Sequence, residues 1–179
     1  KLQEARASIL RAIKIGRAIK SSRCIHYALI GLGDLHIIEA QEKLANMASP
    51  PSDDTQHLLR RAKTTLQRVV SLEGLEAEPT IEGKYLLATT LNLLGETEMA
   101  HRLASATLKE AWENEVIRSA GHILRLLGSI AQHNLDFAEA ELNFEQALQI
   151  FHERELHMDY ARTLYLYSKM LLQRGTLAE

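Results

Sequence analysis

Apolar and small residues recur at helical spacing in two adjacent stretches of residues 124–148. In the first stretch they stand at i, i+3, i+4 and i+7, at Leu124, Leu127, Gly128 and Ala131. In the second stretch they again share one helical face, at Ala140, Phe144, Ala147 and Leu148. This spacing is typical of amphipathic helices that bury one face. The pattern therefore predicts two short helices packed as a hairpin.

The residues between the two stretches indicate where the second helix begins. Asp136 is a natural N-cap, and Glu139 three residues later completes a pattern like a capping box. Small residues at Gly128 and Ala140 would let the helix axes approach closely, with Phe144 filling the space beside that contact. Because glycine costs a helix about 1 kcal/mol relative to alanine, Gly128 indicates a packing requirement.

The same positions recur along the chain at a spacing of 40. An earlier set of residues lies 40 positions before residues of the hairpin, at Leu87, Ala88, Ala100, Thr107 and Leu108. Adding 40 to the first helix of the hairpin gives a later set, at Leu164, Tyr167, Ser168 and Leu171. A turn at Gly95 would recur two periods later as a turn at Gly175. Self-similarity at a fixed period predicts a helical repeat protein.

The remaining stretches fit the same organisation and give about eight helices. We expect helices at 1–20, 22–47, 54–73, 81–94 and 97–112, before the hairpin and a last helix. The stretch 22–47 is either one long helix or two, broken at Gly31 and Gly33 near Asp34. Residues 48–54 hold two prolines and predict a loop, Gly74 ends a helix, and 76–80 predict a linker.

The hairpin resembles the tetratricopeptide repeat, a helix-turn-helix unit with small residues at fixed places. The positions that match are Leu124, Leu127, Gly128, Ala140, Phe144 and Ala147. The sequence departs from the family at Ala131, usually a large aromatic, and at His152, often a proline. The repeat of 40 residues is longer than the ordinary tetratricopeptide repeat of about 34 residues. In this it is similar to the repeats in the helical sensor domain of the bacterial maltose-regulon activator and related signalling ATPases. The resemblance implies one all-α domain over 1–179, a right-handed superhelix of antiparallel helix hairpins.

Composition supports a helical protein with its own core. The chain has 179 residues, of which 46% are hydrophobic and only 5% aromatic, which suits close helix packing better than a sheet sandwich. The single Cys24 excludes an internal disulfide and fits a reducing compartment. No apolar run approaches the length of a membrane span. We expect part of a larger cytoplasmic protein with no membrane partner.

Positive charge is concentrated at the start of the chain. Residues 1–23 hold one acid, Glu4, and seven basic residues, Lys1, Arg6, Arg11, Lys14, Arg17, Lys20 and Arg23. The net charge of the whole chain is −2. This segment is interpreted as a solvated face or a surface that meets a neighbouring domain, with contact to an anion as the alternative. Nucleic acid is not an expected partner, because no aromatic residues are interleaved with the basic ones.

No sequence motif predicts catalysis, a cofactor or a metal. Gly31 and Gly33 lack the third glycine of a dinucleotide loop, and neither a phosphate loop nor a nucleophile elbow is present. His152 and His157 are five residues apart and would point about 140° away from each other on a helix, whereas a metal needs its ligands on one face. The histidines are the only support for an enzymatic function, so we expect a protein that is not an enzyme.

The resemblance to stacked hairpins instead predicts a concave wall lined by the outward residues of each first helix. By spacing from the small core residue these are Tyr85, Thr89 and Asn92, then His122, Arg125, Ser129 and Gln132, then Arg162, Tyr165 and Lys169. Ordinary solvated surface, or surface covered by a further helix, is the alternative. The family's chaperone-tail clamp uses Lys and Asn where Arg125 and Ser129 stand, so that specialised role is not expected.

These features favour a non-catalytic interaction or sensor scaffold within a larger signalling or regulatory protein. Its partner would be a protein or peptide, a neighbouring domain of the parent chain, or a small polar ligand such as a sugar. The alternative is a small-molecule-sensing domain of a transcriptional activator. Self-association is a further possibility, because both ends of the chain would expose repeat faces.

Overall fold

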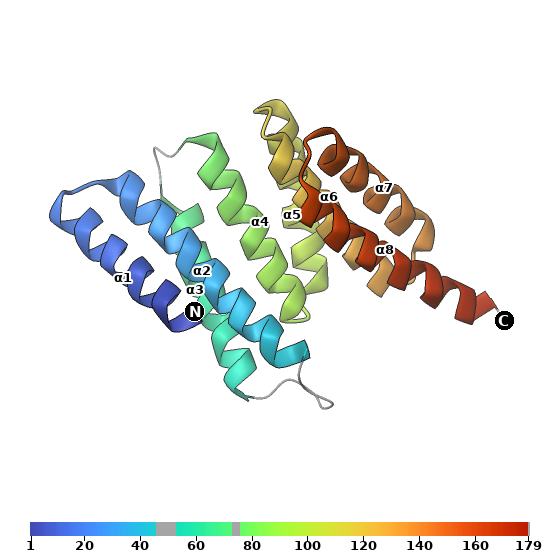
Figure 1. Ribbon diagram of the computed structural model, residues 1–179, viewed down its shortest axis with the longest axis horizontal. Coiled ribbons are helices and arrows are strands. Elements are labelled where there is room, and N and C mark those ends of the chain that lie inside the picture. Colours follow the sequence, from blue (N-terminus) through green and yellow to red (C-terminus); the bar gives the residue numbers. More distant parts are fainter. Residues whose placement is uncertain (46–52, 73–75, 179) are drawn as a thin grey trace. The chain divides into compact units, whose positions relative to one another are not determined.

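The computed structural model describes residues 1–45, 53–72 and 76–178, and in this part the chain forms eight α-helices and no strand (Figure 1). The helices are α1 (Leu2–Ala18), α2 (Ser22–Ala45), α3 (Asp53–Val70), α4 (Ala77–Leu93), α5 (Thr97–Glu113), α6 (Ile117–His133), α7 (Phe137–Glu153) and α8 (His157–Ala178). The predicted all-α class and the number of helices are confirmed.

The chain divides into two compact units, Lys1–Ala100 and His101–Glu179. In the first, the N-terminal unit, α2 packs against α1, α3 and α4, and α3 also packs against α4. In the second, the C-terminal unit, α6 and α7 form the predicted hairpin, and α8 packs against both. Consecutive helices thus pack as hairpins within each unit. A single domain over 1–179 and a superhelical path stay predictions.

Helices in both units approach each other where one of them carries a glycine. A Cβ added to Gly128 of α6 would lie 3.0 Å from the ring of Phe144 in α7, which is fully buried. In the N-terminal unit, a Cβ on Gly33 of α2 would lie 2.6 Å from Leu66 of α3. The packing role predicted for Gly128 is confirmed, and Gly33 has the same role beside a smaller partner.

The 40-residue period has a local cause in the turns. Residues with a left-handed backbone recur every 20 positions, with φ of 81° at Gly95, 58° at Glu115, 63° at Leu135 and 55° at Glu155. Each turn also closes with a backbone bond from the next residue to a carbonyl five residues back, such as Asp136 N to Ala131 O at 2.9 Å. This is the Schellman type of helix end. Each helix with its turn takes 20 residues, and a hairpin takes 40.

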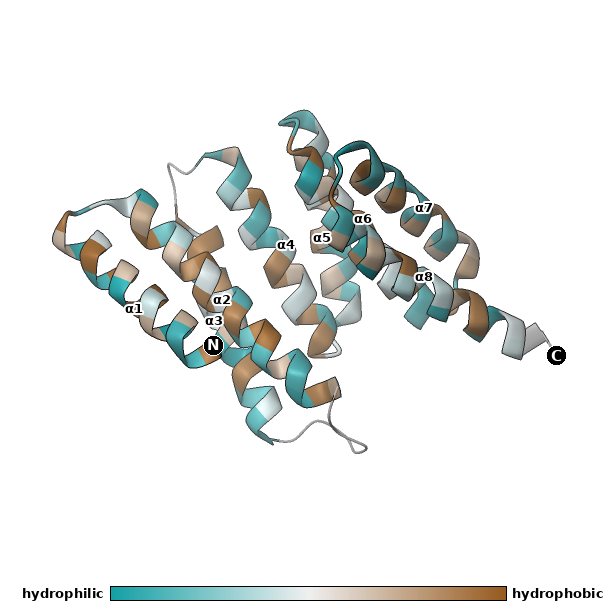
Figure 2. Ribbon diagram, in the orientation of Figure 1, coloured by the Kyte–Doolittle hydropathy of each residue, from teal (hydrophilic) through white to brown (hydrophobic). Residues whose placement is uncertain are grey.

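The start of α7 follows the predicted cap. Asp136 Oδ1 accepts a hydrogen bond from the backbone N–H of Glu139 at 3.1 Å. That bond satisfies one of the free donors of the first helical turn. Figure 2 shows brown and teal segments alternating along the helices, as expected when one face of each helix is apolar.

The stretch 22–45 is one continuous helix, so the alternative of a break near Asp34 is wrong. Gly33 is needed where Leu66 packs, and its backbone stays helical. The two prolines of the predicted loop 48–54, and Gly74, lie outside the described residues. Asp53 and Asp54 already belong to the first turn of α3.

Two predictions about helix ends are wrong. The predicted linker 76–80 is the beginning of α4, whose N-cap is Glu76. Pro79 stands in the first turn, where the missing N–H has no intrahelical acceptor to lose. Gly175 does not form a turn either, since α8 continues through it to Ala178. Thr176 Oγ1 donates to the carbonyl of Gln173 at 2.9 Å, which is compatible with a continuing helix.

Candidate functional site

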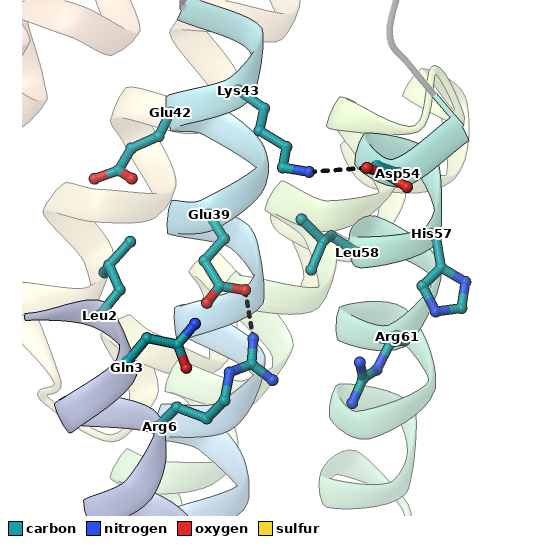
Figure 3. Close-up of a pocket in the computed structure, with 10 residues that line it drawn as sticks. All are labelled: Leu2, Gln3, Arg6, Glu39, Glu42, Lys43, Asp54, His57, Leu58 and Arg61. Atoms are coloured by element: carbon teal, nitrogen blue, oxygen red, sulfur yellow. Dashed lines mark hydrogen bonds and ion pairs between the residues drawn. The ribbon is translucent and has the colours of Figure 1, made fainter.

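A cleft of about 840 Å³ lies in the N-terminal unit, where α1 and α3 both flank α2 (Figure 3). Its lining comes from all three helices: Leu2, Gln3 and Arg6 of α1, Glu39, Glu42 and Lys43 of α2, and Asp54, His57, Leu58 and Arg61 of α3. Charged and polar side chains predominate, with Leu2 and Leu58 as the apolar part. A cleft of this size can hold a small ligand or a short stretch of peptide.

Two ion pairs tie the helices together along this cleft. Arg6 Nη2 of α1 lies 2.5 Å from Glu39 Oε2 of α2, and these side chains are 24% and 14% exposed. Lys43 of α2 lies 3.3 Å from Asp54 of α3, with side chains 44% and 82% exposed. The exposed second pair contributes at most about 1 kcal/mol. The first is better shielded from water and positions the wall formed by α1.

Arg61 and His57 stand one turn apart on α3 and line the opposite wall. Both side chains are exposed, and neither makes a hydrogen bond or ion pair with another residue in the described part of the chain. A guanidinium is permanently charged and offers parallel N–H donors that fit a carboxylate. Arg61 and His57 are therefore the groups that the cleft leaves available to an anionic ligand.

A buried histidine lies next to this cleft. His36 of α2 is 1% exposed, and among the described residues neither ring nitrogen has a hydrogen-bond partner. Burial, and after it the positive charges of Arg61 and Arg6, lower the pKa of His36 to about 4, against a smaller opposing effect of Glu39. The ring is therefore neutral at neutral pH. An unsatisfied polar group in this position destabilises the unit.

Two residues of the predicted concave strip converge on one carboxylate in the C-terminal unit. Arg125 Nη1 and His122 Nε2 of α6 each lie 3.2 Å from Asp159 Oδ1 of α8. The Arg125, His122 and Asp159 side chains are only 14%, 18% and 13% exposed. The guanidinium of Arg125 also lies 5.5 Å from the centroid of the Phe151 ring. These contacts tie α8 to α6 and α7.

Burial and charge act against each other in this cluster. Burial lowers the pKa of His122, and the charge of Arg125 lowers it further, although Asp159 opposes both. Burial raises the pKa of Asp159, but His122 and Arg125 outweigh that effect and hold the pKa below its usual value. Asp159 is therefore ionised at neutral pH and already engaged by two side chains.

The other strip residues of α6 also make contacts within the unit. Gln132 Nε2 donates to Gln173 Oε1 of α8 at 2.9 Å, and Ser129 Oγ donates to the carbonyl of Arg125 at 3.1 Å. On α8, by contrast, Arg162, Tyr165 and Lys169 are exposed, and Lys169 Nζ lies 5.7 Å from the centroid of the Tyr165 ring.

The strip residues of α4 belong to the N-terminal unit. Tyr85, Thr89 and Asn92 are partly buried along one side of the helix, and Thr89 Oγ1 donates to the carbonyl of Tyr85 at 3.0 Å. A ligand groove made by the whole strip stays a prediction. The cleft at Arg61 was not predicted from the sequence; the basic character of residues 1–23, which include Arg6, was the one signal that pointed towards it.

The described part of the chain contains neither a candidate metal site nor a candidate membrane span. Among the described residues no group of three or more His, Cys, Asp or Glu side chains is placed to hold a metal ion. No helix in the described ranges is long and apolar enough to cross a membrane.

No family model and no curated protein matches this sequence. Among solved structures the chain is similar to the crystal structure of BtubC (BKLC) from P. vanneervenii, with 20% sequence identity and a TM-score of 0.60. The similarity covers 94% of this chain and 66% of the BtubC chain, so this chain spans slightly less than two thirds of its length. At this identity the likeness shows an all-helical, repeat-like fold and nothing about a ligand.

Proposed function

We propose that this chain is a non-catalytic scaffold of the tetratricopeptide type, whose cleft between α1, α2 and α3 binds an acidic peptide segment of a partner protein. The observation that carries the proposal is the wall of α3, where Arg61 and His57 line the cleft without a carboxylate partner in the described residues. The repeat register around Gly33 and Gly128 supports the family assignment.

The other charges of the cleft favour recognition by a few polar contacts. Arg6 and Lys43 are held by Glu39 and Asp54, so a ligand carboxylate meets Arg61 without displacing an existing pair. Leu2 and Leu58 offer apolar contact to neighbouring side chains of the peptide. One hydrogen bond to a charged group contributes about 1.5–3 kcal/mol. We therefore expect an affinity typical of transient regulatory complexes.

The test uses the whole chain and a pool of short fluorescent peptides, each with Asp or Glu between neutral residues. Arg61→Ala is expected to weaken binding of the best peptide about tenfold or more, as loss of a charge-assisted bond implies. Arg60→Ala is the matched control, because it removes the same charge one residue away on α3. Arg60 donates to Gln56 at 3.0 Å and does not line the cleft.

Two results would overturn the proposal. One is that no peptide of the pool binds more tightly than its counterpart with Asn and Gln in place of the acids. The other is that Arg61→Ala and Arg60→Ala bind the best peptide equally well.

A cytoplasmic setting belongs to the same proposal, supported by the free thiol of Cys24.

The second candidate is a small-molecule sensor that acts within a transcriptional activator. It is favoured by the cleft volume of about 840 Å³, which falls in the range of small-ligand sites. Calorimetry with a panel of sugars and small carboxylic acids tests it. Saturable heat that is lost in Arg61→Ala would favour the sensor, whereas peptide binding without any such heat would exclude it.

A further inference from the structure

One side of α8 exposes an apolar surface. Met158, Tyr165 and Leu172 recur every seven residues and are 70%, 63% and 71% exposed. Leu164 and Leu171 lie on the adjoining side and are 42% and 37% exposed. Between these two rows run the small residues Ala161, Ser168 and Gly175, also seven apart. We call this surface the α8 face. Contiguous apolar patches on a protein surface mark interaction sites.

The same unit contains a covered version of this face. On α6, Gly121 and Gly128 stand seven residues apart, and α7 packs over them. Their added Cβ atoms would lie 2.7 Å from Phe151 and 3.0 Å from Phe144. Adding 40 to Gly121 and Gly128 gives Ala161 and Ser168 of the α8 face.

The exposed fractions measure the difference between the two helices. Leu124 lies between the two glycines of α6 and is 2% exposed, whereas its counterpart Leu164 is 42% exposed. A Cβ added to Gly175 would have no atom within 4 Å. The α8 face thus repeats the surface on which α6 receives α7, and no helix covers it in the described part of the chain.

The small residues limit what can pack there. Ala161 and Ser168 each carry a Cβ where α6 has only hydrogen, so a phenyl ring placed as in α7 would clash. Aliphatic side chains are less bulky than a phenyl ring and leave more room for those Cβ atoms. The matching surface is an amphipathic helix with Leu, Ile or Val at a spacing of seven.

Charge selects the partner further. Arg162 and Lys169 run along one edge of the α8 face, are exposed, and have no carboxylate partner in the described residues, while Arg174 is held by Glu141 at 2.8 Å. A helix with acidic residues along the matching edge would satisfy both. A second copy of the α8 face would instead bring like charges together, and so would the basic helix α1, which carries Arg11, Lys14 and Arg17.

We propose that the α8 face binds an acidic amphipathic helix of a partner protein, in the position that α7 takes on α6. This site lies in the C-terminal unit and does not depend on the cleft at Arg61. The two surfaces would let one chain hold two different segments.

The probe is a labelled synthetic peptide with the sequence of α7, residues 137–153, in which leucine replaces Phe144 and Phe151. It carries four glutamates, Glu139, Glu141, Glu145 and Glu153. Binding to the whole 179-residue chain is followed by fluorescence anisotropy at low salt. We expect saturable binding of the probe. Ser168→Trp should weaken it about tenfold or more, because the large side chain fills the row of small residues on the α8 face at an exposed position without touching the core.

Two double variants test the role of charge at the α8 face. Arg162→Glu with Lys169→Glu is expected to weaken binding about tenfold. Lys109→Glu with Arg154→Glu, an equal charge change at exposed positions on α5 and at the end of α7, is expected to leave binding within about twofold. Probe binding that Arg61→Ala removes belongs to the cleft, and probe binding that Ser168→Trp removes belongs to the α8 face, so a failure of the cleft and a failure of this site are distinguishable.

Three outcomes would overturn the proposal. The first is no saturable binding of the probe. The second is equal binding by Ser168→Trp and the unaltered chain, which would place the probe elsewhere, for example on α6. The third is a dimer of the unaltered chain, seen by sedimentation, that Ser168→Trp converts to monomer. That result would assign the α8 face to a second copy of this chain.

Discussion

Replacing the buried histidine beside the cleft should change how acid affects stability. His36 has a folded-state pKa of about 4, below the usual value of about 6.5 that it regains on unfolding. The unfolded chain therefore takes up a proton at a pH where the folded chain does not. Stability from this difference is fully present above pH 6.5 and is lost as the pH falls from about 6.5 to about 4.

The size of this effect on stability follows from the difference between the folded and unfolded pKa values of His36. A difference of about 2.5 pKa units corresponds to about 3 kcal/mol over the whole range. Between pH 7 and pH 5 the folded chain loses about 2 kcal/mol through this one side chain. Because the ring is 1% exposed, solvent screening does not greatly reduce the figure. His36→Leu removes the titrating group and both unsatisfied nitrogens.

The assay is urea unfolding followed by circular dichroism at pH 7 and pH 5, for the unaltered chain and for His36→Leu. We expect the loss of unfolding free energy between the two pH values to be about 2 kcal/mol smaller in the variant. We also expect the variant to be at least as stable at pH 7, because leucine leaves no buried polar atom unpaired. The same loss of unfolding free energy with pH in both proteins would contradict this prediction, since His36 would then not titrate differently on folding.

Three further predictions concern the helix contacts and ends. Gly128→Ala should destabilise the chain by about 1–3 kcal/mol, because its Cβ would lie 3.0 Å from Phe144. Gly175→Ala, whose Cβ would have no atom within 4 Å, should stabilise the chain or leave it unchanged. Equal shifts in melting temperature for the two variants would contradict the packing role of Gly128. Leu135→Gly should raise the unfolding free energy by about 1 kcal/mol, because Leu135 has a φ of 63° that glycine adopts without a steric penalty; a destabilised variant in urea unfolding would show that the side chain matters more. Asp159→Ala should lower the unfolding free energy by about 2 kcal/mol or more, because it leaves Arg125 partly buried without its carboxylate. In the unaltered chain the stabilisation by Asp159 should vanish as the pH falls below the usual carboxyl range, because the pKa of Asp159 is lowered on folding. A variant as stable as the unaltered chain at pH 7 would contradict this.

Local sequence rules predicted the helices and their contacts well. The Asp136 cap and the meeting of Gly128 with Phe144 depend on residues close in sequence, and both are found as predicted. The rules failed at Gly175 and at 76–80. In both places a residue that often ends or precedes a helix stands in a position that a helix tolerates.

The candidate sites were harder to predict. Spacing placed Arg125 on the outward side of α6 but could not reveal its partner Asp159. Asp159 is 34 residues later in the sequence, and its Oδ1 is 3.2 Å from Nη1 of Arg125. The cleft depends on three helices whose charged residues come together only in the fold. No periodicity links Arg6, Glu39 and Arg61, because side chains at helix edges are not constrained by the core pattern.

The most direct test of the proposed binding site is a map of where an acidic peptide contacts the chain. Amide chemical shifts of isotope-labelled protein would be followed during titration with the best peptide of the pool, for the unaltered chain and for Arg61→Ala. Binding at the cleft predicts saturable shifts confined to residues lining it on α1, α2 and α3, and in the variant a midpoint at a peptide concentration about tenfold or more higher. Shifts that cluster elsewhere, or that saturate at the same peptide concentration in Arg61→Ala, would contradict the proposed binding site.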